Sequence, residues 1–421
     1  MRFIIFCLLL ISNWGYSQHF DQFFIDKTLR VDAVFAGNSE RQSIVIDELN
    51  ELPSWAGRKQ HLSKNHLGGN GVISMYDIKT DQLIYTQSFS TLYQEWLSTP
   101  EAQLKSKNFE NVFLLPFPKS EVRLEIALID SSGNYPVLLK QRVDPTDVLI
   151  HKKGYRYITP HTLLHRAKTA TNSINIVIVA EGFQDNQMDK FKQYAQTTID
   201  EIFAHQPFGQ FQDRFNIYAV ESVSSDNGVS VPRLNEWKNT AVESNFDTFY
   251  SERYLTTARV KKLHDLLAGI PYEHIIILAN TDVYGGGGIY NAYTLTTTGH
   301  ANFKPIVVHE FGHSFAGLSD EYFYESDVLS DMQSIALEPW EQNITTLKNF
   351  DSKWKDMLSP KTPIPTTSKD VDKYPLGVYE GLAGKKIYKA ALDCRMKTNT
   401  AKEFCPVCQR AISRLIQFYT D

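Results

Sequence analysis

A His-Glu-x-x-His motif at residues 309–313 limits the folds that this chain can adopt. On an α-helix, His309 and His313 lie about 40° apart around the axis, so both rings can reach one metal ion. An apolar run precedes the motif, which predicts a helix with a buried side. Gly317 is expected to end this helix, because glycine readily takes the left-handed conformation found just after a helix.

Carboxylates close to the two histidines indicate hydrolytic metal chemistry. Glu310 projects beside the rings, where it can act on a metal-activated water without binding the metal itself. Asp320 and Glu321 follow the predicted helix, and either carboxylate could return to the metal as a third ligand. Two histidines, a base and an open metal position are what zinc-dependent peptide hydrolysis requires.

The N-terminus is predicted to be a signal peptide spanning residues 1–17. Arg2, an apolar run over residues 3–11 and small residues before Gln18 form the expected pattern. The run is too short to cross a membrane, and no later segment reaches about 18 consecutive apolar residues. We therefore expect an exported bacterial protein, secreted or held in the periplasm or at the cell surface, without a transmembrane segment. The net charge of −5 argues against a nucleic-acid partner.

Residues 18–155 are predicted to form an all-β, sandwich-like accessory domain. Short β-rich stretches alternate with turn signals, and the clearest hairpin has its turn at residues 131–134. This part contains no catalytic constellation, so we expect a structural or binding module. The strands are expected at residues 28–35, 42–46, 72–78, 83–89, 122–129 and 135–141.

Residues 156–421 are predicted to form an α/β (α+β) domain. The stretch 174–179 is almost entirely apolar, as in a strand that is buried on both faces. Strands that alternate with helices favour a largely parallel sheet. The strands are expected at residues 174–179, 215–220, 274–278 and 289–294, and the helices at residues 189–203, 260–267 and 406–419.

Three cysteines gather near the C-terminus: Cys394, Cys405 and Cys408. An exported protein folds in an oxidising compartment, which favours a disulfide and leaves one thiol over. Free buried thiols are one alternative. A zinc site is another, but it would need a fourth ligand, and no histidine lies nearby in the sequence. We therefore expect Cys394 to be bonded to Cys405 or to Cys408.

Four consecutive glycines at residues 285–288 precede a predicted strand. They are not followed by the Lys-Ser/Thr pair of a phosphate-binding P-loop. Flexible backbone before an edge strand suits a cleft in which an extended peptide adds as a further strand. A plain turn is the alternative. The candidate substrate strand consists of Gly287, Gly288, Ile289 and Tyr290.

The string from His309 to Tyr322 resembles the metzincin zinc peptidases, and most of all the bacterial IgA-specific metalloendopeptidase family. Metzincins carry two helix histidines, a glycine, and then a third histidine or an aspartate. Here the glycine follows the second histidine after four residues instead of three, whereas the step from Gly317 to Asp320 keeps three. The resemblance runs from about Asn172 to the C-terminus, and the β-rich front part resembles the family's accessory domain. Further matches lie at residues 180–183 and 284–290 and in the terminal Cys-x-Met and Cys-x-x-Cys motifs.

The resemblance implies a metzincin-like catalytic domain with a mixed sheet, an active-site helix and one zinc ion per chain. The implied ligands are His309, His313 and Asp320, with Glu310 as the general base. Asp320 is preferred to Glu321 because it keeps the metzincin step after the glycine, and its shorter side chain loses less rotamer freedom.

The resemblance also implies roles for residues around the ligands. Met396 is similar to the Met-turn that lies beneath the metal in metzincins. Tyr322 and Tyr324 are candidates for supporting the oxyanion, and Glu321 is a candidate for orienting the ligands from outside the coordination shell. The implied substrate is a protein or peptide, and the resemblance does not extend to immunoglobulin as this chain's own substrate.

Two other functions fit parts of the sequence. A non-catalytic adhesion or glycan-binding protein with a structural metal would account for the large β-rich front part. Glu310 weighs against it, because a structural metal site needs no base. A zinc amidase or esterase that acts on cell-wall material would use the same metal chemistry. Spacing and composition carry no information on the oligomeric state.

Overall fold

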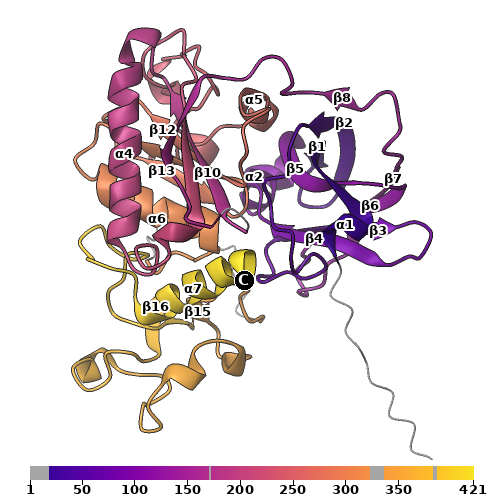
Figure 1. Cartoon of the computed structure of the whole chain (residues 1–421). Coiled ribbons are helices and arrows are strands. Elements are labelled where there is room, and N and C mark those ends of the chain that lie inside the picture. Colours follow the sequence, from indigo (N-terminus) through magenta and orange to yellow (C-terminus); the bar gives the residue numbers. More distant parts are fainter. Residues whose placement is uncertain (1–18, 170–171, 323–335, 383–385) are drawn as a thin grey trace, which may run out of the picture.

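The computed structural model describes residues 19–169, 172–322, 336–382 and 386–421. An N-terminal part made of β-sheets packs beside a C-terminal part in which helices cover a mixed sheet (Figure 1). The predicted signal peptide, residues 1–17, lies outside the described residues. Within the described ranges, no helix is both long and apolar enough to cross a membrane.

Two four-stranded sheets make up most of the N-terminal part, with strand orders β5-β1-β2-β8 and β4-β3-β6-β7. Buried side chains from both sheets, among them Phe35 and Ile73, form one apolar core. The strands are β1 (Phe24–Gly37), β2 (Gln42–Leu52), β3 (Gly71–Asp77), β4 (Leu83–Phe89), β5 (Lys107–Pro118), β6 (Val122–Leu128), β7 (Val137–Val143) and β8 (His151–Lys152). The helices are α1 (Phe20–Phe23), α2 (Leu92–Leu97) and α3 (Glu101–Leu104).

Each strand predicted in the N-terminal part is present, although β1 and β2 are longer than expected. The pattern analysis missed β5, which contains Pro116 and Pro118. Proline removes a backbone donor and is tolerated in sheets mainly at an edge. Since β5 is an edge strand of its sheet, its prolines remove few hydrogen bonds between strands.

A buried ion pair joins the N-terminal part to the C-terminal part. Arg30 in β1 donates from Nε and Nη2 to the two carboxylate oxygens of Asp32, at 2.6 and 2.7 Å. Its Nη1 atom lies 2.7 Å from the carboxylate of Asp265 in α5 (Val260–Leu266). Both Arg30 and Asp32 are fully buried. A buried guanidinium with partners on both sides fixes the orientation of the two elements that supply them.

The central sheet of the C-terminal part has six strands in the order β13-β14-β12-β10-β11-β9. The inner pairs are parallel, whereas the edge strands β13 and β9 run antiparallel to their neighbours. The sheet is therefore mixed. Its inner strands are parallel, as expected from the alternation of strands and helices along the chain. The strands are β9 (His161–His165), β10 (Ile174–Glu181), β11 (Phe215–Val220), β12 (His274–Ala279), β13 (Gly286–Ile289) and β14 (Tyr293–Thr297).

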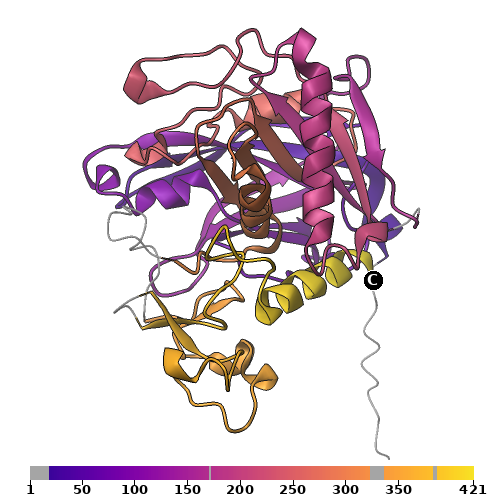
Figure 2. The same ribbon diagram turned by 90° about the vertical axis from the view of Figure 1, so that its left-hand side faces the viewer.

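Strand β10 is buried along its whole length, as predicted, because both faces of the sheet are covered. Ile176 and Ile178 face a core that includes α4 (Met188–Ala204), α6 (Phe303–Ala316) and α7 (Pro406–Thr420). Val177 and Val179 face a second core shared with α5 and with Leu92 of the N-terminal part. Figures 1 and 2 show α4 upright beside the sheet and α7 crossing below it.

A small three-stranded sheet follows α6 in the chain, with the strand order β15-β17-β16. Its strands are β15 (Ile344–Thr345), β16 (Tyr379–Leu382) and β17 (Ile387–Lys389). The residues between β15 and β16 form a lobe that extends below α7 in Figure 2. The last part of the chain returns from this lobe to α6 and ends in α7.

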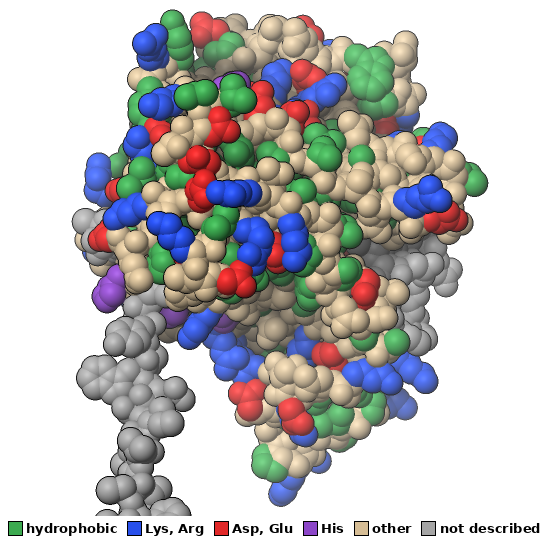
Figure 3. Space-filling model, turned by 90° about the vertical axis from the view of Figure 1, so that its right-hand side faces the viewer, with side chains coloured by type: hydrophobic (Ala, Val, Ile, Leu, Met, Phe, Trp, Pro, Cys, Tyr) green, Lys and Arg blue, Asp and Glu red, His purple; other side chains and the backbone are tan. Residues whose placement is uncertain are grey.

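The surface of the N-terminal part carries charges of both signs. Figure 3 shows Lys and Arg side chains interspersed with Asp and Glu over this face. Some are paired across the two parts, as in the contact between Lys261 Nζ and Asp47 at 2.5 Å. This mixture agrees with the nearly balanced totals of 43 basic and 48 acidic residues.

A hairpin replaces the continuous strand that we predicted over residues 289–294. Strand β13 ends at Ile289, and Ile289 pairs with Tyr293 at the start of β14. Asn291 takes a φ of +53° in the turn between them, a conformation that asparagine tolerates better than most residues. Tyr290 also lies in this turn, and its buried hydroxyl is 3.3 Å from Ser88 Oγ. The predicted substrate strand is therefore wrong at Tyr290, which lies outside β13.

Candidate active site

Helix α6 carries the His-Glu-x-x-His motif and ends where the sequence predicts. Its C-terminal Gly317 has a φ of +56°, and the Gly317 amide donates to the carbonyl of His313 at 2.9 Å. A Cβ atom on Gly317 would lie 2.4 Å from the ring of Trp340. Both the backbone conformation and the close ring therefore require glycine, which lets the chain turn back beneath the helix.

The chain after Gly317 brings Asp320 to the two histidines. The Nε2 atoms of His309 and His313 are 3.1 Å apart. Asp320 Oδ1 lies 3.0 Å from the first and 3.2 Å from the second. Three ligands bound to one zinc at 2.0–2.1 Å would be separated by about 3.3 Å. The three atoms therefore already have nearly the spacing of a metal-ligand set.

The other ring nitrogens fix the histidine tautomers. His309 Nδ1 lies 2.9 Å from the carbonyl oxygen of Arg395, and His313 Nδ1 lies 2.5 Å from that of Leu318. A carbonyl oxygen only accepts hydrogen bonds, so each Nδ1 carries the proton. Both Nε2 lone pairs then face each other and Asp320, which is how histidines are held when they bind a metal.

The close approach of the two Nε2 atoms and Asp320 Oδ1 favours a positive charge between them. Burial lowers the pKa of His313, but the charge of Asp320 outweighs it and raises the pKa to about 9. The pKa of His309 also rises, because the contact with Asp320 outweighs the effect of burial. Among the described residues, none donates a hydrogen bond to the buried Oδ1 of Asp320. A divalent cation at the centre of these three atoms would supply this charge, so the residues fit a zinc ion.

Glu310 lies beside this group and against the edge strand β13. One of its carboxylate oxygens is within 4.8 Å of a ring nitrogen of His309 and of His313. Burial raises the pKa of Glu310, and the nearby imidazoles oppose the shift. A Cβ atom on Gly286 would lie 2.9 Å from Glu310 Oε1, so the glycine leaves room for the carboxylate. The contacts of Asp320 Oδ1 with both Nε2 atoms, at 3.0 and 3.2 Å, make Asp320 the candidate third ligand, and Glu310 lies beside this group.

The glycine run allows β13 to lie directly on α6. A Cβ atom on Gly288 would lie 2.2 Å from the carbonyl oxygen of Glu310 and 2.8 Å from His313 Cβ. On the other face of the strand, a Cβ atom on Gly287 would lie 2.7 Å from the ring of Tyr254. The glycines are thus needed for close packing on both faces, which the alternative of a plain turn does not explain.

The outer edge of β13 is partly occupied. The Gly286 amide donates to the carbonyl of Arg253 at 3.3 Å, and the amide of Leu255 donates to the Gly286 carbonyl at 3.4 Å. An incoming peptide strand would therefore have to pair with β13 beyond Gly286. Gly287 and Gly288 lie in that part of the strand, and Ile289 is buried.

Two of the other predicted site residues pack against α6 or its histidines. Met396 is fully buried, and its Sδ lies 2.7 Å from the position of a Cβ on Gly312, in the middle of α6. The ring of Tyr322 stacks on that of His309, with centroids 6.0 Å apart. The charge of Asp320 raises the pKa of Tyr322. Tyr324 lies outside the described residues.

The predicted disulfide is wrong for this structure. Cys394, Cys405 and Cys408 are all free and buried. Cys408 Sγ lies 3.8 Å from Cys394 Sγ and 3.6 Å from Cys405 Sγ, far longer than a bond of about 2.05 Å. Instead of forming a disulfide, the three thiols gather around Glu321. Glu321 Oε1 is 3.5 Å from Cys408 Sγ. Glu321 thus points away from the histidines and toward the cysteines.

The pattern analysis missed two residues near Glu310. Tyr254 donates a hydrogen bond to Glu95, which belongs to α2 of the N-terminal part. Burial raises the pKa of Glu95 to about 7, with a further contribution from the charge of Glu310. No spacing rule connects residues 95, 254 and 310, because only the packing of the two parts brings them together.

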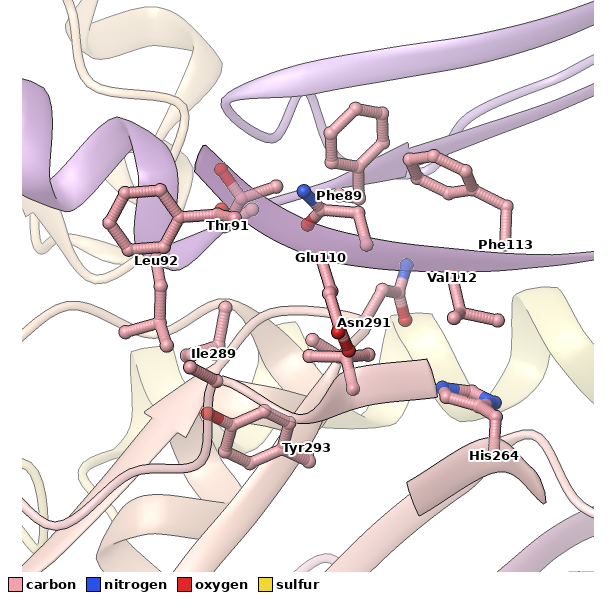
Figure 4. Close-up of a pocket in the computed structure, with 16 residues that line it drawn as sticks. Phe89, Thr91, Leu92, Glu110, Val112, Phe113, His264, Ile289, Asn291 and Tyr293 are labelled. Atoms are coloured by element: carbon pink, nitrogen blue, oxygen red, sulfur yellow. The ribbon is translucent and has the colours of Figure 1, made fainter. Parts of the chain in front are cut away.

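A pocket lies where the N-terminal part meets the β13–β14 hairpin. Figure 4 shows Phe89, Glu110 and Val112 on one side, with Asn291 and Tyr293 on the other. His309, Glu310, His313 and Asp320 are not among the residues that line it. The pocket therefore belongs to the contact between the two parts and not to the candidate metal centre.

Comparison with known families gives two matches along the chain. The family model described as IgA Peptidase M64 matches residues 163–376. The model described as Peptidase M64 N-terminus matches residues 19–139. No curated protein gives a significant match to the chain.

Replacing Gly288 by alanine is expected to force β13 away from α6. The new Cβ would meet backbone of α6 at 2.2 Å, and such overpacking costs about 1–3 kcal/mol. Gly288→Ala should lower the melting temperature and any hydrolytic activity together. Gly381→Ala is the matched control, because its Cβ would meet nothing closer than 3.4 Å. Equal melting temperatures for Gly288→Ala and the wild type would contradict the proposed close packing.

The raised pKa of Glu95 predicts a pH-dependent stability. Its ordinary value is 4.5 and its folded value is about 7, so the folded state holds the proton more tightly. The resulting stabilisation is complete below pH 4.5 and is lost as the pH rises through 7. In chelator-treated protein, the melting temperature of Glu95→Gln relative to the wild type should therefore rise between pH 4.5 and 7.5. A difference that stays constant over this range would show that Glu95 titrates normally.

Proposed function

Because the chain belongs to the IgA peptidase M64 family and is thus a peptide-bond hydrolase, we propose that it is a zinc-dependent endopeptidase. Its catalytic domain would be metzincin-like, with the β-sheet part as an accessory domain. The observation that carries the proposal is the convergence of three ligand atoms within 3.0–3.2 Å of one another. The zinc ligands would be His309, His313 and Asp320, and one coordination position would stay open.

A zinc ion in this position would supply a Lewis acid that makes a bound water acidic near neutral pH and polarises the scissile carbonyl. The rings of His309 and His313 are held for this role by backbone carbonyls, so no side chain has to move to form the site. Asp320 would offset part of the metal's charge, which keeps the centre close to neutral with two uncharged imidazoles.

Glu310 would move the proton in this reaction. Its carboxylate lies within 4.8 Å of a ring nitrogen of each histidine, so it could hydrogen-bond to a water between them. It would accept the proton of the attacking water and donate it to the leaving amine, after which the carboxylate is regenerated. The packing of Gly286 against Glu310 limits the directions in which the carboxylate can turn.

The substrate would be a protein or peptide bound in an extended form. Strand β13 borders Glu310, so a peptide paired beyond Gly286 would run past the base and the metal position. Tyr322 lies on the ring of His309 and is a candidate donor to the oxyanion. The N-terminal signal pattern supports export as the setting for this activity.

Glu310→Gln is the direct test of the base. The variant should still bind zinc, because all three ligands remain. Hydrolysis of a casein or mixed-peptide substrate should fall by about 10²–10⁴-fold, the usual contribution of a general base. Glu252→Gln is the control, since the Glu252 side chain is 75% exposed. Near wild-type cleavage by zinc-loaded Glu310→Gln would overturn the proposed role.

Asp320→Ala tests the third ligand. Removing it leaves two histidines, so the free zinc concentration that gives half-maximal activity should rise by more than about 100-fold. Activity measured over a series of zinc buffers gives this value directly. Asp282→Ala, which removes an exposed aspartate, should leave it unchanged. An unchanged zinc requirement in Asp320→Ala would mean that another group holds the metal.

A further inference from the structure

A second cluster of ligand atoms lies apart from the histidines. It consists of the Sγ atoms of Cys394, Cys405 and Cys408 and a carboxylate oxygen of Glu321, all within 4.8 Å of one another. All four residues are buried. They come from three separate segments: the loop after α6, the turn that contains Met396, and the first turn of α7. The peptidase mechanism uses none of the four.

The spacing of these atoms matches an empty tetrahedral site. Zinc–sulfur bonds of 2.3 Å place two sulfurs about 3.8 Å apart, and a sulfur and a carboxylate oxygen about 3.6 Å apart. The distances from Cys408 Sγ are 3.8 Å to Cys394 Sγ, 3.6 Å to Cys405 Sγ and 3.5 Å to Glu321 Oε1. Free thiols packed as apolar groups have no reason to surround a carboxylate at these distances.

One oxygen of the Glu321 carboxylate lacks a partner among the described residues. Glu321 is 1% exposed, and among the described residues its Oε2 atom receives no hydrogen bond. Its Oε1 atom accepts one from Asn343 at 3.1 Å. A buried carboxylate oxygen without a donor or a cation is costly. This orphaned atom is an observation independent of the cysteines, and it points to a positive charge at the cluster.

The surroundings of the sulfurs also favour thiolates. The Cys405 amide donates to Cys394 Sγ at 3.2 Å. Cys405 is the N-cap of α7 and Cys408 lies in its first turn, where the helix dipole stabilises negative charge. The amine of the buried Lys389 lies 3.3 Å from the Glu321 backbone carbonyl and offsets part of the remaining negative charge.

We propose that Glu321, Cys394, Cys405 and Cys408 bind a second, structural zinc ion. Four protein ligands close the coordination sphere, and their burial leaves no open position for water or substrate. Zinc suits a tetrahedral set of three thiolates and one carboxylate, whereas calcium and magnesium require oxygen ligands. The number of zinc ions expected per chain therefore rises from one to two.

This second zinc would hold the active-site ligands in place. Glu321 follows Asp320 directly, and the Glu321 amide donates to the carbonyl of Met396 at 2.9 Å. On the same turn, the carbonyl of Arg395 accepts the hydrogen bond from His309 Nδ1. One ion would thus fasten the loop that carries Asp320, the turn that orients His309, and α7. Glu321 acts here as a positioning residue and not as a catalytic one.

The zinc content of variants separates the two sites. By elemental analysis of protein dialysed against zinc buffer, the wild type should hold two zinc ions per chain. The double variant His309→Ala/His313→Ala should hold one, and so should Cys408→Ser. If Cys408→Ser fails to fold, Glu321→Gln takes its place. One zinc ion in the wild type and none in the histidine variant would overturn the second site and leave the peptidase proposal intact.

Cobalt identifies the ligands of the remaining ion. The histidine variant keeps all three cysteines, so loading it with Co²⁺ should give intense thiolate-to-cobalt absorption and a tetrahedral ligand-field spectrum. Peptide mapping without reduction should find no Cys394–Cys408 or Cys405–Cys408 disulfide in the native protein. Absence of the thiolate bands, or a disulfide in the zinc-loaded protein, would overturn the proposal.

Discussion

The hydrogen bond from His309 Nδ1 to the carbonyl of Arg395 joins the two halves of the candidate active site. Helix α6 supplies both histidines, but the helix alone does not orient a ring. The turn at residues 394–396 lies 86 positions later in the chain and holds the first ring from behind. That turn also accepts the Glu321 amide, so the same few atoms position Asp320. The geometry of the candidate metal centre therefore depends on contacts between segments and not on α6 alone.

The N-terminal part is built into this arrangement. The indole of Trp340, which closes over Gly317, donates to Asn70 Oδ1 at 2.7 Å. Asn291 in the β13–β14 turn donates to the carbonyl of Ser88 at 2.8 Å. These contacts connect the N-terminal part to the end of α6 and to the turn that follows the edge strand β13. The N-terminal part thus contacts both elements that lie at Glu310, α6 and the β13–β14 hairpin.

Local patterns were sufficient to predict α6, its end at Gly317 and the buried strand β10, since each depends on residues close in sequence. They failed where contacts between distant segments determine the local structure. The turn at Asn291 interrupts what reads as one strand, and the pairing of Glu321 with the cysteines spans more than 70 residues. No histidine lies near Cys394 in the sequence, and the glutamate that joins the cysteines is distant from them along the chain. Its position next to Asp320 was the only available signal.

The proposed activity requires one metal ion between His309, His313 and Asp320. Anomalous diffraction at the zinc edge, from crystals grown with zinc, locates that ion directly. We expect a peak about 2.0–2.2 Å from both Nε2 atoms and from Asp320 Oδ1, with the Glu310 carboxylate outside the coordination shell. A peak bound by Glu310 in place of Asp320, or no peak between the two histidines, would contradict it.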